Sequence, residues 1–308
     1  MGRIVLNVSL FLMAVPLWIA CTDDGPEPES GLKEERMTNV SYGAHERHQM
    51  DVYLPENRST TSTGMVILIH GGGFVAGDKT HLDDVAAKLM AKGYAVVSIN
   101  YRLVDITGVL DTPPLHQASD ITIHQQLDDV AAAVALAWSK RADWAVNSDK
   151  WYIAGHSAGA TLAMLHAYGD DNADGRIKAA ANWAGVTTFA FNDEAEVELL
   201  DPRVKELFYR IVGTEATNQN KLAYMAASPY WVANNTGGVP TINIRPEDNT
   251  VGPLPDDSKR QYDSLTALLV SKGSASVHVE ISGADHGFGH PGNWDEVIEE
   301  TVSFFDAH

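Results

Sequence analysis

The sequence predicts an α/β fold with a mostly parallel central sheet flanked by helices. From Met37 onward, apolar runs short enough to be strands alternate with longer segments of helical period. That alternation is typical of a parallel sheet covered by helices on both faces. The chain has 308 residues and 44% hydrophobic content, which is enough for one large domain with a sizeable core.

Seven strands are expected. The run at 65–70 is apolar throughout and predicts a fully buried central strand. The others are predicted at 50–55, 94–100, 151–154, 179–184, 241–245 and 276–281.

Helices are expected between and after these strands. Residues 81–92 place Leu82, Val85 and Leu89 on one face, and Gly93 ends the helix. Further helices are predicted at 127–141, 160–168, 264–272 and 296–307.

The strand pattern lapses between about Thr187 and Trp231. Polar residues there mix with large apolar ones, namely Leu199, Leu200, Phe208, Tyr209 and Ile211. We interpret this segment as a helical insertion. It either lines a substrate pocket or packs on the edge of the sheet, and the sequence leaves both open.

Charge argues against a nucleic-acid partner. The net charge is −19, from 22 basic and 41 acidic residues, and the acidic residues are spread along the chain. Such a surface repels phosphate backbones and mostly confers solubility.

The N-terminus predicts export. Residues 1–20 combine one early positive charge with an apolar stretch, as a signal peptide does. Cys21 is the only cysteine, so no intramolecular disulfide is possible, and it stands where a bacterial lipoprotein signal places its lipidated residue. An ordinary signal cleaved nearby and an uncleaved anchor are the alternatives. Residues 21–36 form a polar, acidic, flexible tether, and 37–308 form the catalytic domain.

Ser157 is the candidate nucleophile. It is the centre of the pentapeptide Gly-His-Ser-Ala-Gly at 155–159, after a predicted strand and before a predicted helix. A serine on such a sharp turn adopts strained backbone angles, and flanking glycines let the chain pass close to itself. The alternative is a glycine-flanked serine at an ordinary helix start.

Three consecutive glycines, Gly71, Gly72 and Gly73, follow the buried strand at 65–70. Their backbone N–H groups are unobstructed by a Cβ atom. A phosphate-binding loop is the alternative, but no Gly-Lys-Ser/Thr follows. His70 is interpreted as a hydrogen-bond donor that orients the loop.

Together, the His-Gly-Gly-Gly loop, the serine pentapeptide and a late histidine resemble the α/β-hydrolase superfamily, near its hormone-sensitive-lipase-like and feruloyl- or acetyl-esterase-like carboxylesterases. The resemblance spans about residue 50 to the C-terminus. It implies an oxyanion hole made by the N–H groups of Gly72, Gly73 and Ala158. Gly77-Asp78 and residues 100–103 also match these relatives, and we interpret them as ion pairing that braces the oxyanion loop.

His286 is the expected general base, because it lies after the last strand and before the last helix, where these relatives carry theirs. His290 is the runner-up. The two histidines without a nearby third ligand are a weak metal pair, and we expect no metal or cofactor.

The acid is less determined, since the histidine-glycine pair that usually precedes it is missing. Counting from the strand end places Asn249 in its position, whereas counting back from Val251 gives Asp248. An amide cannot stabilise an imidazolium as a carboxylate does, so Asp248 is preferred and Glu247 is second.

The implied activity is hydrolysis of carboxylic esters through an acyl-enzyme on Ser157. The expected substrate is a small-molecule or carbohydrate-linked ester such as an acetyl or feruloyl ester, and Phe74, Trp183 and Phe288 are expected to contact it. Contact with a membrane is expected only through a lipid anchor on Cys21, at a periplasmic or cell-surface location. The alternatives are a secreted peptidase, an amidase such as a formamidase, and a catalytically impaired binding protein.

Overall fold

The structure, a computed structural model, describes residues 31–252 and 258–308. The predicted signal peptide, Cys21 and most of the predicted tether lie outside the described residues. The first strand begins at Glu35, so the folded domain starts two residues before the predicted boundary at Met37. None of the helices in these two ranges could span a lipid bilayer.

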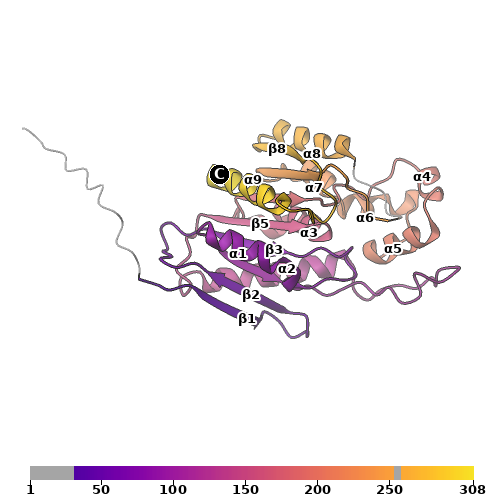
Figure 1. The fold of residues 1–308 in the computed structure, drawn as a ribbon. Coiled ribbons are helices and arrows are strands. Elements are labelled where there is room, and N and C mark those ends of the chain that lie inside the picture. The colour runs from indigo at the N-terminus through magenta and orange to yellow at the C-terminus, as the bar shows by residue number, and fades with distance from the viewer. Residues whose placement is uncertain (1–30, 253–257) are drawn as a thin grey trace, which may run out of the picture.

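The centre of the molecule is an eight-stranded sheet with the order β1-β2-β4-β3-β5-β6-β7-β8 (Figure 1). β1 pairs antiparallel with β2 and β2 with β4, and the other neighbours are parallel. The strands are β1 (Glu35–Ser41), β2 (Gln49–Leu54), β3 (Met65–Ile69), β4 (Ala95–Ile99), β5 (Trp151–His156), β6 (Ala179–Trp183), β7 (Thr241–Pro246) and β8 (Ser276–Ile281).

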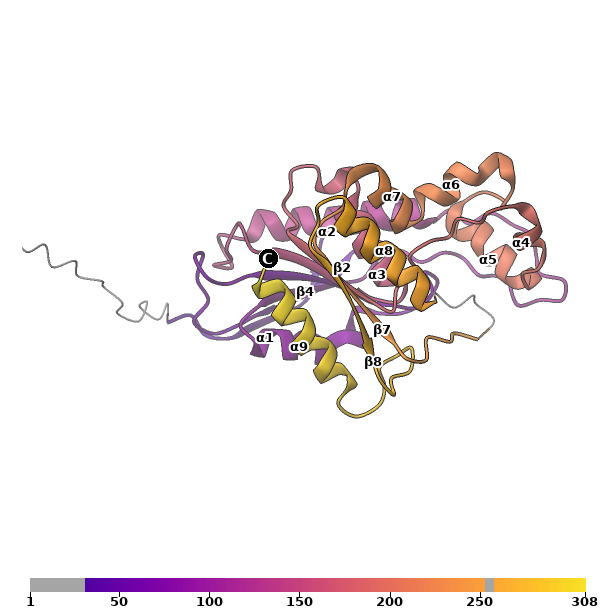
Figure 2. The same ribbon diagram turned by 90° about the horizontal axis from the view of Figure 1, so that it is seen from above.

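Helices cover both faces of the sheet (Figure 2). α1 (Asp83–Ala91) and α9 (Asn293–Asp306) lie on one face, and α2 (Ile123–Lys140), α3 (Ala158–Tyr168) and α8 (Lys259–Ser271) lie on the other. Two apolar cores result, one on each side. Because both faces are covered, β3, β4 and β6 are buried along their whole length, and the prediction of a parallel, helix-covered sheet is confirmed.

The predicted helical insertion is also confirmed. Between β6 and β7 the chain forms α4 (Glu194–Glu198), α5 (Pro202–Val212), α6 (Lys221–Ala226) and α7 (Pro229–Thr236), so the insertion ends five residues beyond the predicted Trp231. α5 begins at Pro202 after the capping side chain of Asp201, and it stops at the left-handed Gly213. α4, α5 and α6 gather beyond one end of the sheet (Figure 1).

β1 has no counterpart among the predicted strands. Five of its seven residues are exposed, because it forms the edge of the sheet, so it carries no apolar run to reveal it. Three 3₁₀ turns complete the described elements: η1 (Lys79–Leu82), η2 (Asp170–Asn172) and η3 (Asn218–Asn220).

The sheet register brings four loops to one edge. Ile69 lies beside Gly155, His156 beside Trp183, and Pro246 beside Ile281. The segments that follow β3, β5, β7 and β8 therefore leave the same end of the sheet. These segments carry the glycine loop, Ser157, Asn249 and His286.

Candidate active site

Ser157 occupies a strained turn between β5 and α3. Its backbone angles are φ 53° and ψ −123°, and its N–H donates to the carbonyl of Trp183 at 2.8 Å. A Cβ atom on Gly155 would lie 2.4 Å from the backbone of Gly159, and one on Gly159 would lie 2.2 Å from the carbonyl oxygen of Ile69. Only glycines fit at both positions, which explains the residue types of the pentapeptide.

His286 lies against the serine hydroxyl. Its Nε2 is 2.9 Å from Ser157 Oγ, and its Nδ1 is 2.7 Å from Asn249 Oδ1. A carbonyl oxygen only accepts, so Nδ1–H donates to Asn249 and Nε2 is left to accept the serine proton. This is the tautomer that a general base requires.

The imidazole of His286 is a weak base in this setting. Burial, followed by the neighbouring His156, lowers the pKa of His286 to about 4, while Asp285 acts in the opposite direction. His156 Nε2–H donates to the carbonyl oxygen of His286 at 2.7 Å and so holds the loop that carries the base. His286 is therefore neutral at neutral pH and ready to accept a proton.

Asp248 was predicted to be the acid that bonds to His286, and this prediction is wrong. Its side chain is exposed and turns back to accept from the N–H of Thr250 at 3.0 Å. Glu247 is exposed as well and accepts from the N–H of Gly283 at 2.7 Å. The N–H of Asp248 bonds to the carbonyl of Ala284, and the next side chain, that of the buried Asn249, points at the imidazole. The count from the strand end gives the observed position.

His290, the runner-up base, is exposed on the surface, with its Nε2 3.8 Å from Asp285. No group of three His, Cys, Asp or Glu side chains in the described part of the chain is arranged to hold a metal ion.

The glycine loop lies directly against the serine turn. A Cβ atom on Gly71 would sit 3.1 Å from Ser157 Cβ. Gly72 and Gly73 have positive φ values of 122° and 60°, and Ala158 is the first residue of α3. The expected oxyanion donors thus come from segments that touch one another beside Ser157.

The residues expected to brace this loop do so, but not by the ion pair that was expected. Asp78 accepts from Asn100 Nδ2 at 2.8 Å, which is a hydrogen bond to a neutral amide. Arg102 instead pairs with Asp129 of α2, with Nη2 2.6 Å from Oδ1. Gln126 Nε2 holds the loop from the other side by donating to the carbonyl of Phe74 at 2.7 Å.

An apolar cavity of about 230 Å³ opens beside Gly73. The insertion supplies most of its wall, so this segment does line a pocket. The aromatic and aliphatic lining residues are Val186, Phe189, Ala190, Phe191, Val197, Leu200, Leu207, Phe208, Ile211, Ala216 and Tyr224, with Thr188, Glu196, Lys205 and Gln261 as polar members. Phe189 and Phe191 belong to the irregular segment after β6, where no periodicity marks them.

Two of the three residues expected to contact substrate are elsewhere. Trp183 is fully buried on the α9 side of the sheet, where its Nε1–H donates to Thr301 Oγ1. Phe288 is fully buried against Trp294 and His156. Both expectations are wrong, because each ring lies in the core on the α9 side of the sheet and not at the cavity beside Gly73. Phe74 is 4% exposed and packs behind Phe189, with the ring centroids 5.8 Å apart.

Part of the chain is similar in sequence to known enzymes. A kynurenine formamidase of Salmo salar is 28% identical over 148 residues, which are 48% of this chain and 43% of that protein. The chain spans less than half the length of the curated relatives that it matches.

Solved structures share the fold. A truncated carbohydrate esterase from gut microbiota superposes with a TM-score of 0.66 at 21% identity, covering 91% of this chain and 98% of that one. A thermophilic esterase from Thermogutta terrifontis gives a TM-score of 0.64 at 19% identity, covering 92% and 96%.

The BD-FAE family model matches residues 50–253, which is more than half of the chain and includes the glycine loop, Ser157 and Asn249. The sheet is that of an α/β hydrolase, and His286 is hydrogen-bonded to Ser157 on the turn after β5. The match to the family model shows that the chain belongs to the BD-FAE family.

Proposed function

We propose that this protein is a serine carboxylesterase that works through an acyl-enzyme on Ser157. The observation that carries the proposal is the hydrogen-bonded chain from Ser157 Oγ through His286 to Asn249, at 2.9 and 2.7 Å. The esterase structures that share its fold are consistent with it.

Acylation begins when Ser157 Oγ attacks the ester carbonyl carbon and His286 Nε2 takes the hydroxyl proton. The carbonyl oxygen becomes an oxyanion, which the N–H groups of Gly72, Gly73 and Ala158 receive. The tetrahedral intermediate then breaks its bond to the alcohol, and His286 returns the proton to the leaving oxygen. A water molecule activated by His286 repeats the sequence and releases the carboxylic acid.

Asn249 orients the imidazole in this cycle but supplies no charge. Its Oδ1 dipole fixes Nδ1–H and keeps Nε2 toward the serine. The imidazolium formed at each proton transfer is therefore less stabilised than one beside a carboxylate. We expect a functional but moderate catalyst.

The cavity beside Gly73 receives the acyl group. Its aromatic wall, with Phe189, Phe191 and Phe208, suits a short aliphatic chain or a flat aromatic ring. Acetyl or feruloyl groups esterified to carbohydrates are the proposed natural substrates, in keeping with the carbohydrate esterase among the structures of the same fold.

An ester panel tests the proposal. Wild type and Ser157→Ala are compared on p-nitrophenyl acetate, butyrate, octanoate and laurate, on methyl ferulate and on acetylated xylan. We expect Ser157→Ala to remain folded and to lose at least about 10³-fold in kcat. Turnover that is unchanged by Ser157→Ala rejects the proposal, and a preference for acyl chains longer than eight carbons rejects the carbohydrate ester.

An amidase is the second candidate, favoured by the likeness to kynurenine formamidase over about half of the chain. Hydrolysis of an aryl formamide more rapidly than of the matching aryl acetate supports this second activity. If Ser157-dependent hydrolysis is absent from both series, a secreted peptidase and a catalytically impaired binding protein are the remaining candidates.

We also propose that the protein is exported and anchored through lipid on Cys21. The support is the apolar segment at 4–20 followed by the only cysteine of the chain. The full-length protein from a bacterial host should enter the detergent phase on Triton X-114 partition, and Cys21→Ser should move it to the aqueous phase. Equal partition of the two proteins contradicts the anchor.

A further inference from the structure

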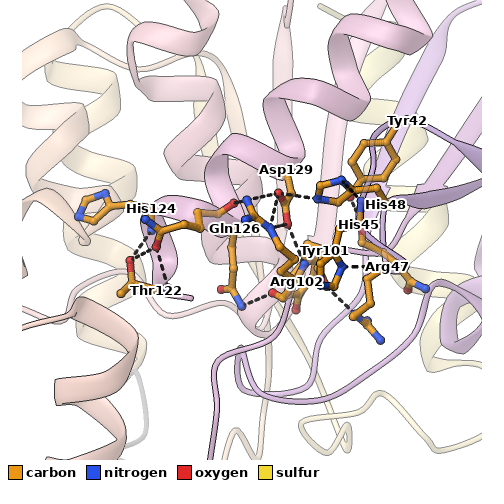
Figure 3. Close-up of polar contacts among 12 residues, drawn as sticks. Tyr42, His45, Arg47, His48, Tyr101, Arg102, Thr122, His124, Gln126 and Asp129 are labelled. Carbon is orange, nitrogen blue, oxygen red and sulfur yellow. Dashed lines mark hydrogen bonds and ion pairs between the residues drawn. The ribbon is translucent and has the colours of Figure 1, made fainter. Parts of the chain in front are cut away.

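Arg47 reaches the oxyanion loop from the turn between β1 and β2. Figure 3 shows its side chain beside Tyr101. Arg47 Nε donates to the carbonyl of Tyr101 at 2.7 Å, and Nη2 donates to the carbonyl of Gly77 at 2.9 Å. One guanidinium thus joins the segment after β4 to the end of the glycine loop.

The same guanidinium faces His70 at the start of the loop. His70 Nδ1–H donates to the carbonyl of Gly71 at 2.7 Å, which leaves Nε2 to accept from Arg47 Nη2 at 3.4 Å. Burial lowers the pKa of His70 to about 4, and the charge of Arg47 acts in the same direction. His70 is neutral at neutral pH, so this arrangement of donors is fixed. Its ring stacks on Tyr101, whose hydroxyl donates to the carbonyl of His70 at 3.0 Å.

The turn that carries Arg47 is itself anchored to α2. His48 Nδ1 accepts from the N–H of His45, so His48 Nε2–H donates to Asp129 Oδ1 at 3.0 Å. Asp129 is 2% exposed and also binds Arg102 (Figure 3). Tyr42 stacks on His48, with the ring centroids 4.9 Å apart. Arg47 therefore extends from a fixed support.

The glycine loop is closely packed between Arg47 and Ser157. A Cβ atom on Gly77 would lie 2.2 Å from the carbonyl oxygen of Gly71, and Gly71 in turn lies against Ser157. A shift at Gly77 must therefore move Gly71 and the N–H groups of Gly72 and Gly73 that follow it. A misplacement of about 1 Å in an active site, even from a mutation far from the chemistry, can cost about 10²-fold in rate.

We propose that Arg47 is a positioning residue of the active site, holding Gly77 and His70 so that the N–H groups of Gly72 and Gly73 meet the oxyanion. This inference rests on the proposed esterase function. Arg47 touches no reacting atom, so its effect is expected on the transition state rather than on ground-state binding.

The test compares Arg47→Ala, Arg47→Gln and Arg47→Lys with wild type and with Arg36→Ala as a matched control. Arg36 is an exposed arginine of β1 that pairs with Glu34. kcat and KM are measured on p-nitrophenyl acetate, thermal unfolding is followed for each variant, and affinity is measured for an alkyl trifluoromethyl ketone, which forms an oxyanion when Ser157 adds to it.

For Arg47→Ala we expect kcat to fall about 10- to 100-fold with KM within about threefold, and ketone affinity to fall in parallel with kcat/KM. Arg47→Lys restores part of the loss because an ammonium can bind one of the carbonyls, and Arg36→Ala behaves as wild type. If Arg47→Ala does not fold, Arg47→Gln gives the same reading.

Folded variants that keep kcat within twofold overturn the inference, as does a loss of kcat with unchanged ketone affinity. A rise in KM alone also overturns it. If instead wild type shows no hydrolysis that depends on Ser157, the proposed function itself fails, and that outcome is distinct from every outcome above.

Discussion

Replacing Asn249 with aspartate places a carboxylate where an amide now orients the base. Asn249 Oδ1 is 2.7 Å from His286 Nδ1, and Asn249 is 4% exposed, so little solvent screens the new charge. A carboxylate at this distance typically raises a histidine pKa by about 1–3 units. Starting from a pKa of about 4, His286 should titrate at about 5–7 in Asn249→Asp.

The expected gain follows from the stabilised imidazolium. Each pKa unit corresponds to about 1.4 kcal/mol, or about tenfold, if the transition state carries the full charge. Only part of that charge is formed at the transition state, so we expect kcat/KM to rise about tenfold at pH 8. The base must be neutral to act, so the gain should shrink as the pH falls through the new pKa.

The assay is the pH profile of kcat/KM on p-nitrophenyl acetate from pH 4 to pH 9. Wild type should keep its acid limb near pH 4, and Asn249→Asp should shift the limb upward. Asp248→Asn is the matched control, since Asp248 is exposed and bonded to Thr250, and it should stay within about threefold of wild type. An unshifted acid limb in Asn249→Asp refutes the reasoning, as does wild-type activity in Asn249→Ala.

Three further predictions concern stability and specificity. His166 is 2% exposed, and burial lowers its pKa from 6.5 to about 4. As the pH falls, this histidine is therefore protonated in the unfolded chain before it is protonated in the folded one. The folded state loses stability as the pH falls from 6.5 toward 4. The free energy of unfolding is measured in urea at pH 4.5 and 7.5, and His166→Gln should reduce the difference between the two values by up to about 3 kcal/mol. The same difference in wild type and His166→Gln would contradict this. Phe208→Ala enlarges the cavity beside Gly73 and should raise the octanoate-to-acetate ratio of kcat/KM by roughly tenfold, whereas an unchanged ratio places the acyl chain elsewhere. Gly155→Ala forces a Cβ atom to within 2.4 Å of Gly159, so circular dichroism should show a melting temperature lowered by several degrees or no folded protein, and a wild-type melting curve would show that the turn can relax.

Much of the framework could be predicted from the local sequence. The strands β2 to β7 could be predicted as mostly apolar runs, because both faces of the sheet are covered and the side chains in its centre are buried. β8, at the other edge, alternates polar and apolar residues instead. β1 was not predicted, since this exposed edge strand carries no apolar run. Ser157 and its glycines are readable because the steric demand acts between residues two to four positions apart.

The identity of the third site residue depended on the direction of one turn. Asp248 and Asn249 are adjacent, and the spacing arguments for them conflict. The N–H of Asp248 donates a hydrogen bond to the carbonyl of Ala284, which lies far along the chain. With the backbone held in this way, the side chain of Asn249 points toward His286 and that of Asp248 points toward solvent. A general preference for a carboxylate therefore pointed to the wrong neighbour.

The covered parallel sheet, the nucleophile turn and the order of glycine loop, serine and late histidine could all be predicted from the sequence, because they follow from local periodicity and local sterics. Three other features could not be predicted: the side of the sheet on which Trp183 and Phe288 lie, the rings of the insertion that line the cavity, and the contact of Arg47 with Gly77. Those features depend on contacts between segments separated by tens of residues. In strands buried on both faces, no alternation of polar and apolar residues reveals which side chain points toward which layer.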